Sequence, residues 1–269
     1  MICRLFLSKK IKKMVEQMLP AERKSQILKY IQREKAVKTE DLSKYFDVHE
    51  ATIRRDLTFL EQENKIKRTH GGVVLNEEVF SEPHFDERES SLFEEKKRIG
   101  VKAASFINDG DSIILDSGTT TKQIAEAIKD RSNITVITND IHIAALLTRS
   151  SVKVVVTGGI LFSENFILNG EITNQTLSKL NVTKAFIATP ALHPQKGLTH
   201  FDDTLISAKI SMIRAAKEIF VVTDHSKLGM ASLYTFGEMD KIHHIITDDK
   251  ISEKMEKELK ERCNNVWIV

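Results

Sequence analysis

A short run of hydroxyl-bearing residues around Gly118 has the composition of a phosphate-binding loop. Residues 116–121 read Asp-Ser-Gly-Thr-Thr-Thr, directly after the apolar run Ser112–Leu115 and at the start of a predicted helix. A glycine lets the backbone approach a ligand, and the free N–H groups at a helix N-terminus bind anions together with neighbouring hydroxyls. Alone this is a weak signal, because threonine and glycine are common at helix starts.

Three further segments with similar chemistry follow other predicted strands. Thr138-Asn139-Asp140 and Gly158-Gly159 each close a strand, and residues 224–229 read Asp-His-Ser-Lys-Leu-Gly. Lys227 in the last segment supplies a point charge suited to phosphate. Asn169-Gly170-Glu171 could add a turn nearby. Four such segments at equivalent strand ends predict an anion site more strongly than any one of them.

A second kind of chemistry lies nearer the N-terminus, on a helix expected over about residues 50–63. Its inward stripe is apolar, and its outward face is small, polar and rich in arginine. A guanidinium can form paired hydrogen bonds with guanine in the major groove of DNA, or neutralise a phosphate. A basic run then alternates and turns at Gly71-Gly72, as a β-hairpin would. The residues predicted to contact DNA are Thr39, Ala51, Thr52, Arg54, Arg55, Thr58, Lys67, Arg68, His70 and Gly71.

The elements expected to present this face have the order of a winged helix-turn-helix. Helical spacing runs from Ala21 to about Glu34, and Thr39 is a good N-cap for a short helix over residues 40–46. Residues 47–49 form a tight turn before the arginine-bearing helix. The turn, the adjacent arginines and the basic hairpin together favour a DNA-binding unit over an ordinary helical bundle.

From Val101 onward, short β-branched runs alternate with helical stretches. Such alternation requires crossover connections and gives a largely parallel sheet, in which ligands bind at the carboxyl ends of strands. The expected fold class is α/β, with the winged helix-turn-helix followed by a larger domain built on that sheet. The expected strands are 112–115, 134–138, 153–157, 184–188, 219–223, 244–247 and 266–269, and the expected helices are 120–129, 141–149, 173–180, 203–216 and 252–262.

Composition and charge exclude several classes of protein. Apolar residues make up 41% of the 269 residues, enough for a folded core, and no apolar run approaches the roughly 18 residues that a membrane span needs. Cys3 and Cys263 form no disulfide framework or zinc pattern, so we expect a cytoplasmic protein without a metal site. Residues 1–76 carry 17 Lys+Arg and 10 Asp+Glu, whereas residues 77–269 carry 23 and 28. The basic front end suits an anionic partner.

The start of the periodic pattern sets the first domain boundary. Met14 and Met18 are alternative starts, and we expect the working protein to begin at Met18. An acidic stretch with Pro83 inside it then predicts a hinge that leads into a helix. The expected segments are an extension without fixed structure over 1–18, the winged helix-turn-helix over 19–76, a linker and helix over 77–98, and the α/β domain over 99–269.

These motifs closely resemble the DeoR family of bacterial transcription regulators. In the front end the resemblance rests on VHEATIRRDL at residues 48–57, on KRTHGG at 67–72 and on LPAER at 19–23. Residues 85–88 and 95–99 resemble the interdomain segment of the family. In the larger domain it rests on DSGTTT, VITND, TGG, LNGE, KGLTHFDD and DHSKLG, so that it covers about Leu19 to Asp248.

The resemblance implies a regulator, more often a repressor, whose sensor domain is similar in fold to ribose-5-phosphate isomerase. It implies a phosphorylated sugar as effector ligand, no other cofactor, a double-stranded DNA operator, and a homodimer or homotetramer. Of the candidate effector residues, it implies Asp116, Gly118, Thr119, Thr120, Asn139, Gly158, Gly159 and Lys227, to which the neighbouring segments add Thr121, Thr138 and Asp224.

The sequence departs from the family pattern at three places. His49 stands where the family has a serine that caps the arginine-bearing helix. Leu205-Ile206 replaces a frequent Glu-Ala pair four residues before Lys209, and Ala188–His193 replaces a stretch that commonly contains glycine. The last two lie near the expected sugar end of the site, so we expect intact phosphate recognition and an unusual sugar.

Two other functions are compatible with parts of the sequence. A sugar-phosphate isomerase needs a carboxylate base, for which Asp116, Glu171, Asp202 and Asp203 are candidates, but Leu205 occupies the best position for one. An interaction scaffold without a ligand would show no thermal stabilisation by any phosphosugar. The regulator remains the leading interpretation, and we expect no catalysis.

Overall fold

The computed structural model describes residues 20–34, 36–62, 65–69, 71–75, 85–163 and 165–269. These residues fall into two compact units that divide between residues 82 and 83. Each unit is described by itself. The predictions made for residues 1–18 and for His70 lie outside the described residues.

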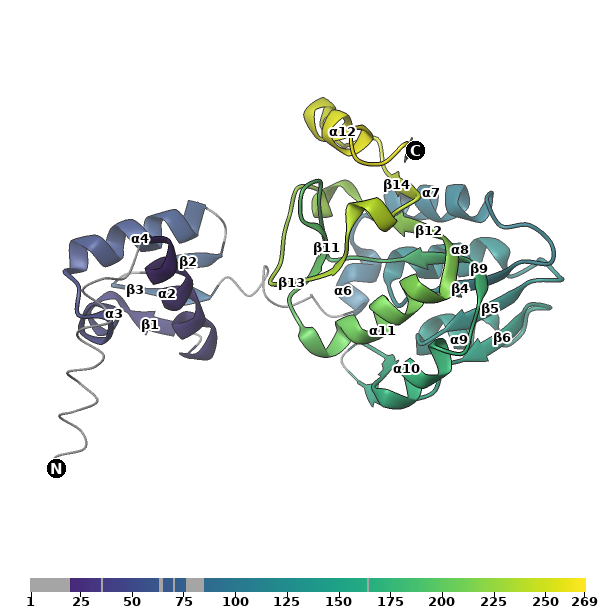
Figure 1. Cartoon of the computed structure of the whole chain (residues 1–269), viewed down its shortest axis with the longest axis horizontal. Helices are drawn as coiled ribbons and strands as arrows, with labels where there is room; N and C mark the ends of the chain where they lie inside the picture. Colours follow the sequence, from purple (N-terminus) through teal and green to yellow (C-terminus); the bar gives the residue numbers. More distant parts are fainter. Residues whose placement is uncertain (1–19, 35, 63–64, 70, 76–84, 164) are drawn as a thin grey trace. The chain divides into compact units, whose positions relative to one another are not determined.

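Among its described residues, the first unit combines three helices with a small antiparallel sheet of order β1-β3-β2. The apolar stripes of the helices meet in one core, which also contains Ile66 and Val73 of the sheet. Asp47 adopts a left-handed backbone with φ 48°, which ends one helix and turns the chain towards the next. The elements are α2 (Pro20–Glu34), β1 (Ala36–Lys38), α3 (Thr39–Phe46), α4 (Glu50–Gln62), β2 (Ile66–Thr69) and β3 (Gly72–Leu75) (Figure 1).

The second unit is built on a seven-stranded parallel sheet. From β4 the chain moves to β5 and β6 on one side, then returns to β9 on the other, so β4 and β9 flank a topological switch point. A crevice between strand ends is the usual ligand position at such a point. In sheet order the strands are β15 (Asn265–Ile268), β14 (His244–Thr247), β12 (Ala216–Val222), β9 (Val182–Ile187), β4 (Ser112–Leu115), β5 (Thr135–Thr138) and β6 (Lys153–Val156).

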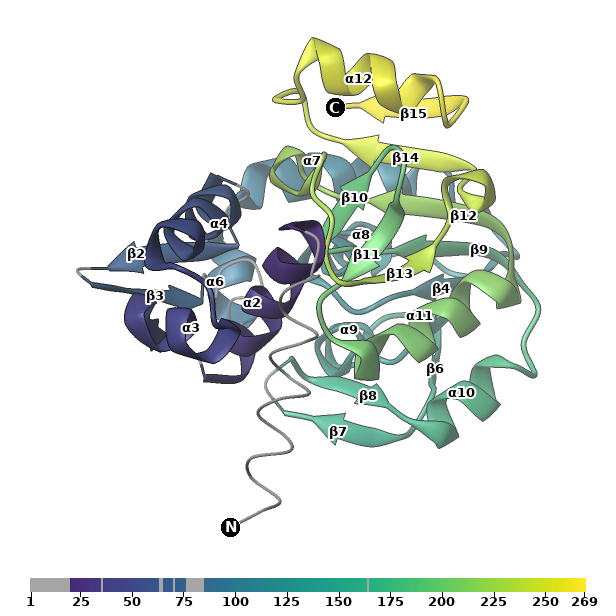
Figure 2. The same ribbon diagram turned by 60° about the vertical axis from the view of Figure 1, so that its left-hand side comes forward.

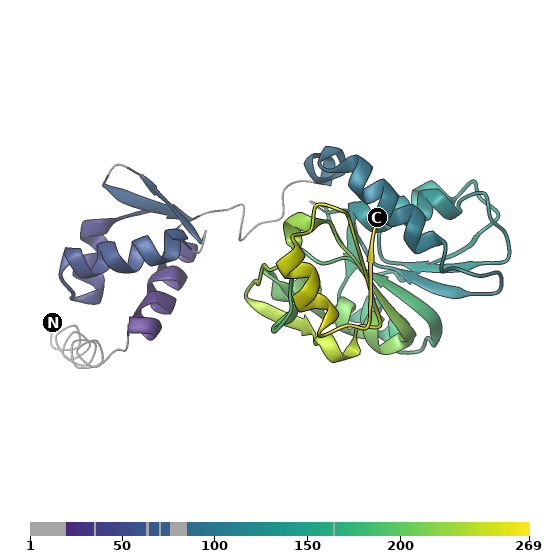
Figure 3. The same cartoon turned by 90° about the horizontal axis from the view of Figure 1, so that it is seen from above.

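Helices cover both faces of this sheet (Figures 1 and 3). α7 (Phe93–Ala104), α8 (Thr119–Ile128) and α9 (Ile141–Leu147) share one core with Ile113 and Leu115 of β4. The opposite core contains Ile114 of β4 and side chains of α10 (Glu171–Leu177), α11 (Asp203–Ala215) and α12 (Glu253–Lys260). Successive residues of the strand therefore face opposite layers, as in any strand buried on both sides.

The predicted fold class is confirmed, and every predicted strand and helix of this unit is present with ends shifted by at most three residues. The helix α6 (Phe85–Ser90) lies in the segment 77–98, for which a linker and helix were predicted. The short strands were not predicted, because runs of three or four residues show no clear period. They form the hairpin of β7 (Ile160–Phe162) and β8 (Ile167–Asn169), and the antiparallel sheet of β10 (Ala191–His193), β11 (Gly197–His200) and β13 (Tyr234–Gly237) (Figure 2).

Candidate functional sites

The outer face of α4 carries most of the side chains predicted to contact DNA. Its inner stripe, Ile53, Leu57 and Leu60, is buried in the core of the first unit. Because residues three and four apart share a helix face, the opposite stripe is left to the solvent. On that stripe Ala51, Arg54, Arg55 and Thr58 are exposed, and Thr52 at its margin is half-buried.

The hairpin of β2 and β3 contacts this helix through Arg68. The guanidinium Nη1 of Arg68 donates to Thr58 Oγ1 at 3.4 Å, and the backbone N–H of Arg68 donates to Glu61 Oε1 at 3.2 Å. Lys67 and Gly71 are exposed on the same hairpin. The basic groups of helix and hairpin therefore lie close together, an arrangement suited to a polyanion.

The two adjacent arginines differ in their contacts. Arg54 Nη2 pairs with Glu50 Oε2 at 3.1 Å, one helical turn earlier. The Arg55 guanidinium forms no hydrogen bond or ion pair with the part of the chain that the structure describes. Arg55 can therefore reach a base without breaking a contact, whereas Arg54 must first release Glu50.

The prediction that Thr39 caps α3 is wrong. The helix begins at Thr39 itself, and the cap residue is Lys38, whose side chain forms no cap hydrogen bond. Thr39 is buried, and its backbone N–H donates to the Gly71 carbonyl at 3.2 Å, so Thr39 joins α3 to the hairpin. Its side chain has little surface to offer to DNA.

His49 precedes α4 and acts as a cap despite its type. Its Nδ1 accepts a hydrogen bond from the Ala51 backbone N–H at 3.2 Å. This is the interaction that a serine at the same position would provide. The departure from the family pattern therefore leaves the helix start capped.

The sequence analysis missed an internal ion pair of the first unit. Arg23 Nε on α2 donates to Asp56 Oδ2 on α4 at 2.6 Å, with side chains only 14% and 8% exposed. The signal was an acid on the inward face of α4, where a buried carboxylate needs a cationic partner. This pair fixes α2 against the helix that carries the arginines.

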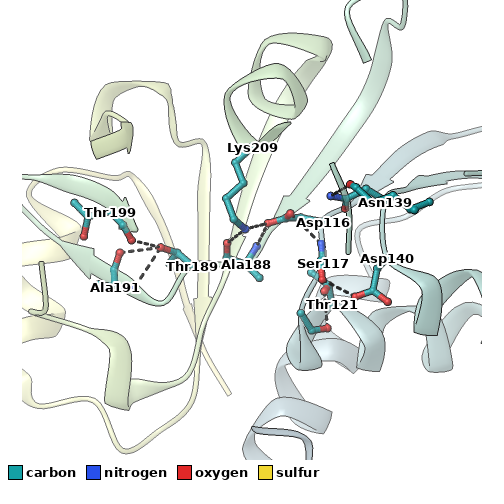
Figure 4. Close-up of polar contacts among 12 residues, drawn as sticks. Asp116, Ser117, Thr121, Asn139, Asp140, Ala188, Thr189, Ala191, Thr199 and Lys209 are labelled. Carbon is teal, nitrogen blue, oxygen red and sulfur yellow. Dashed lines mark hydrogen bonds and ion pairs between the residues drawn. The ribbon is translucent and has the colours of Figure 1, made fainter. Parts of the chain in front are cut away.

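In the second unit, Asp116 lies at the switch point and pairs with a lysine that the sequence analysis did not place in the site. Lys209 of α11 extends towards the sheet, and its Nζ donates to Asp116 Oδ2 at 2.5 Å and to the Ala188 carbonyl at 2.9 Å (Figure 4). The Ala188 and Ser117 backbone N–H groups also donate to Asp116, at 3.0 and 2.9 Å. The carboxyl ends of β4 and β9 are thus joined by one carboxylate.

The charges of this pair lie deep in the protein. The side chains of Asp116 and Lys209 are 2% and 9% exposed. Burial raises the pKa of the Asp116 carboxyl above its ordinary value, while the Lys209 ammonium and the two N–H donors oppose that rise. The pair is therefore sensitive to the loss of either partner.

The N-terminus of α8 follows Gly118. A Cβ at this glycine would lie 2.8 Å from Ala188 Cβ, so only glycine lets the loop pass this close to β9. Thr119 and Thr120 open the helix with side chains that form no hydrogen bond with the described residues, whereas Thr121 Oγ1 donates to the Gly118 carbonyl at 2.8 Å. Two of the three predicted threonine hydroxyls are thus available to a ligand.

The end of β5 brings a second predicted segment to the same edge. Ser117 Oγ donates to Asp140 Oδ2 at 2.7 Å, and Asp140 Oδ1 caps α9 by accepting from the Ile143 N–H (Figure 4). Asn139 Nδ2 donates to the Leu168 carbonyl at 3.1 Å, while its buried Oδ1 has no partner among the described residues. Thr138 Oγ1 accepts from the Asp140 N–H, so its role is internal.

The glycine pair after β6 serves packing. A Cβ at Gly159 would lie 2.3 Å from Thr173 Oγ1, and Thr173 Oγ1 donates to the Gly158 carbonyl at 2.6 Å. Both glycines adopt positive φ, 72° and 128°. The turn is thus pressed against α10, and its glycines are required there whether or not a ligand is bound.

The last predicted segment follows β12. Asp224 is buried and accepts from the Ser226 N–H at 3.0 Å, which shapes the short helix η1 (His225–Lys227). Lys227 is half-buried, and its ammonium forms no hydrogen bond or ion pair with the described residues. The next residues bond to β10, since the Gly229 N–H donates to the Leu192 carbonyl at 2.8 Å.

Contacts link three of the four predicted segments directly or through the β9 end. Residues 116–121 touch Asp140 and Ala188, and the chain after Ala188 leads to Leu192, which bonds to the segment of Lys227. Such an edge offers two free threonine hydroxyls, a helix N-terminus and a lysine, which together suit a phosphate. In the part of the chain described, no cluster of His, Cys, Asp or Glu could hold a metal ion, and no helix is long and apolar enough to cross a membrane.

Comparison with known proteins agrees with both units. The model of the DeoR-like helix-turn-helix domain matches residues 23–79, and that of the DeoR C terminal sensor domain matches residues 92–249. The ribose 5-phosphate isomerase A of Methanocaldococcus jannaschii superposes with a TM-score of 0.37 at 18% identity, over 49% of this chain and 52% of that one.

Two similar proteins match over most of their length, and both are transcription regulators rather than enzymes. The chain is 36% identical to the transcriptional repressor GlcR of Bacillus subtilis, over 86% of this chain and 89% of the relative. It is 30% identical to the glycerol-3-phosphate regulon repressor of Escherichia coli, over 86% and 92% respectively. The chain therefore belongs to the DeoR family of helix-turn-helix transcription regulators.

Proposed function

We propose that this protein is a sequence-specific repressor of sugar-metabolism genes, controlled by a phosphorylated sugar. The proposal of an effector rests on the carboxyl edge of the sheet near the α8 N-terminus. There the Thr119 and Thr120 hydroxyls and the Lys227 ammonium have no partner among the described residues. A phosphate would receive hydrogen bonds from these groups and from the helix N–H groups. The printed names of the relatives, a glycerol-3-phosphate regulon repressor among them, favour the same ligand class.

Asp116, Gly118 and Asn139 complete the proposed site. Asp116 and Lys209 hold the β4 and β9 ends together, Gly118 permits the close approach, and Asn139 Oδ1 offers an acceptor to a sugar hydroxyl. The roles of Thr121, Thr138, Gly158, Gly159 and Asp224 are then to shape the loops. On the DNA side, Arg55 reads bases while Lys67 and Arg68 contact the backbone.

Titration calorimetry with glucose 6-phosphate, fructose 1-phosphate, glycerol 3-phosphate and the unphosphorylated sugars tests the effector. We expect at least one phosphate to bind and its unphosphorylated counterpart to fail. Selection from a random duplex library provides the operator, and the bound phosphate should lower operator affinity. If none of the phosphates binds, the proposed effector class is refuted. If no sequence is selected, the proposed sequence-specific DNA binding is refuted.

We expect paired half-sites and a homodimer or homotetramer, because two linked heads multiply modest individual affinities. Light scattering coupled to gel filtration measures the mass of the assembly. A monomer that still selects a paired operator would contradict this part of the proposal.

A further inference from the structure

A cluster of side chains holds α6 against the rest of the second unit. None of these side chains is among those assigned to the ligand. Phe85, the first residue of α6, is buried and stacks on the ring of His142, with centroids 4.0 Å apart and planes at 17°. Phe166 packs against both rings, with centroids at 6.4 and 4.4 Å. We name this group the α6 clasp; it comprises Phe85, Arg88, Glu89, Lys122, His142, Asn165 and Phe166.

Polar contacts complete the clasp on both sides of the stack. Arg88 Nη2 donates to Asn165 Oδ1 at 3.1 Å, and Glu89 pairs with Lys122 of α8. The cations of Arg88 and Lys122 lie 5.7 and 5.6 Å from the centre of the Phe85 ring. A six-residue helix is marginal by itself, so these contacts must hold it.

Two of the elements that hold α6, namely α8 and the chain after β5, also carry residues assigned to the ligand. α8 carries Thr119 at its first position and Lys122 one turn later. The chain after β5 carries Asn139, then Asp140, then His142 of the clasp. The hairpin of β7 and β8 is bonded to this same stretch after β5, since the Ile141 N–H donates to the Phe166 carbonyl at 3.0 Å and the Leu168 N–H donates to the Asn139 carbonyl at 2.8 Å.

This junction is strained and incompletely hydrogen-bonded. Phe166 adopts a left-handed backbone with φ 56°, which is unfavourable for a bulky residue. Asn139 Oδ1 and His142 Nε2 are both buried without a partner among the described residues. Strained backbone and unsatisfied polar atoms cluster at switch regions. A hydroxyl donated to Asn139 Oδ1 would therefore shift the equilibrium between two states of this junction.

We propose that the α6 clasp transmits effector binding to the chain that leads to the winged helix. This inference rests on the proposed function. α6 is the first described element after residues 76–84, so its docking fixes where that chain leaves the second unit. Effector bound at Thr119, Thr120 and Asn139 favours docked α6, and the docked state has the lower operator affinity. By linkage, docking of α6 raises effector affinity by the same factor.

The first test compares Phe85→Ala with Phe93→Ala, a matched phenylalanine that is 41% exposed at the start of α7 and outside the clasp. Operator affinity is measured with and without the phosphates used above. For the wild type and Phe93→Ala we expect the effector to change affinity by roughly 5- to 150-fold, and for Phe85→Ala by less than about twofold. An undiminished effector response in Phe85→Ala would overturn the proposal.

A milder variant guards against misfolding of Phe85→Ala. Glu89→Gln removes only the pair with Lys122, whose side chains are 34% and 20% exposed, and it should leave the melting temperature unchanged. The effector response is the ratio of operator affinities without and with effector. We expect this ratio to fall to about its square root in this variant, because only one of several clasp contacts is lost. A full effector response in a folded Glu89→Gln would also overturn the proposal.

A ligand-free arm separates this inference from the proposed function. Hydrogen–deuterium exchange is measured on the full chain and on Asn139→Ala, without any effector. We expect faster exchange at the amides of residues 85–90 and unchanged exchange at residues 93–104. If no sugar phosphate binds, the proposed effector is refuted, but this experiment still tests whether Asn139 is coupled to α6. Unchanged exchange at residues 85–90 would refute that coupling.

Discussion

Replacing Lys209 by methionine should destabilise the second unit strongly, because it leaves a charge buried without its partner. Asp116 is 2% exposed and would keep only the N–H groups of Ser117 and Ala188 as donors. Removing one member of a buried pair costs about 3–5 kcal/mol, and the two remaining donors place our expectation near the lower limit, about 3 kcal/mol. Asp116→Asn combined with Lys209→Met should recover most of this loss, since no charge is then buried alone.

Urea unfolding followed by tryptophan fluorescence measures this effect in the correct unit, because Trp267, in β15, is the only tryptophan of the chain. Lys129→Met, which breaks an exposed pair with Glu126, is the matched control and should leave the urea midpoint nearly unchanged. Without Lys209 nothing but two N–H groups opposes the upward shift of the Asp116 pKa. The folded variant then takes up a proton more readily than the unfolded chain, so its deficit should shrink as the pH falls towards 3.8, the ordinary pKa of the carboxyl. A loss below about 1 kcal/mol, or one independent of pH, would refute this reasoning.

Three other changes test the sites separately. Arg55→Ala should weaken operator binding by roughly 1–3 kcal/mol if the side chain reads a base, and an unchanged dissociation constant would remove Arg55 from the interface. Lys227→Ala should abolish the response to the sugar phosphate in a gel-shift assay while operator binding persists; a normal response would place the phosphate elsewhere. Burial acts to raise the pKa of Asp111, but Lys184, 2.6 Å away, and further hydrogen bonds lower it overall. Stability from this group is present above its unfolded pKa and lost as pH falls through the folded value, so Asp111→Asn should be less stable than wild type at pH 7, and the gap should close below about pH 3.8 in urea titrations.

The parallel sheet could be predicted because its central strands are buried on both faces and read as continuous apolar runs, such as Ile113, Ile114 and Leu115. The sheet of β10, β11 and β13 could not, because its strands are very short and β13 pairs with β11 from a position remote in sequence. At Gly197, for example, a Cβ would lie 2.1 Å from the Gly237 carbonyl oxygen. Local propensity carries no information about such a close approach.

At the candidate ligand site, the residue types could be predicted from the sequence, but which side chains face a ligand and which bond internally could not. Three consecutive threonines open α8, yet only Thr121 turns its hydroxyl back to the Gly118 carbonyl. Helix geometry places each hydroxyl on a different side, so the distinction depends on where the helix packs. Lys209 was out of reach for a different reason: its partner Asp116 lies 93 residues earlier, and sequence spacing gives no sign of the pair.

The departure at Leu205 gains a physical meaning from this pair. Leu205 and Lys209 are four residues apart on α11, so they share the buried face of one helix. The glutamate that the family often carries there would lie within one turn of Lys209 and compete with Asp116 for its ammonium. With leucine in its place, Lys209 bonds only to Asp116 and the Ala188 carbonyl among the described residues. A ligand that relied on a carboxylate at this position of α11 would therefore lose that contact.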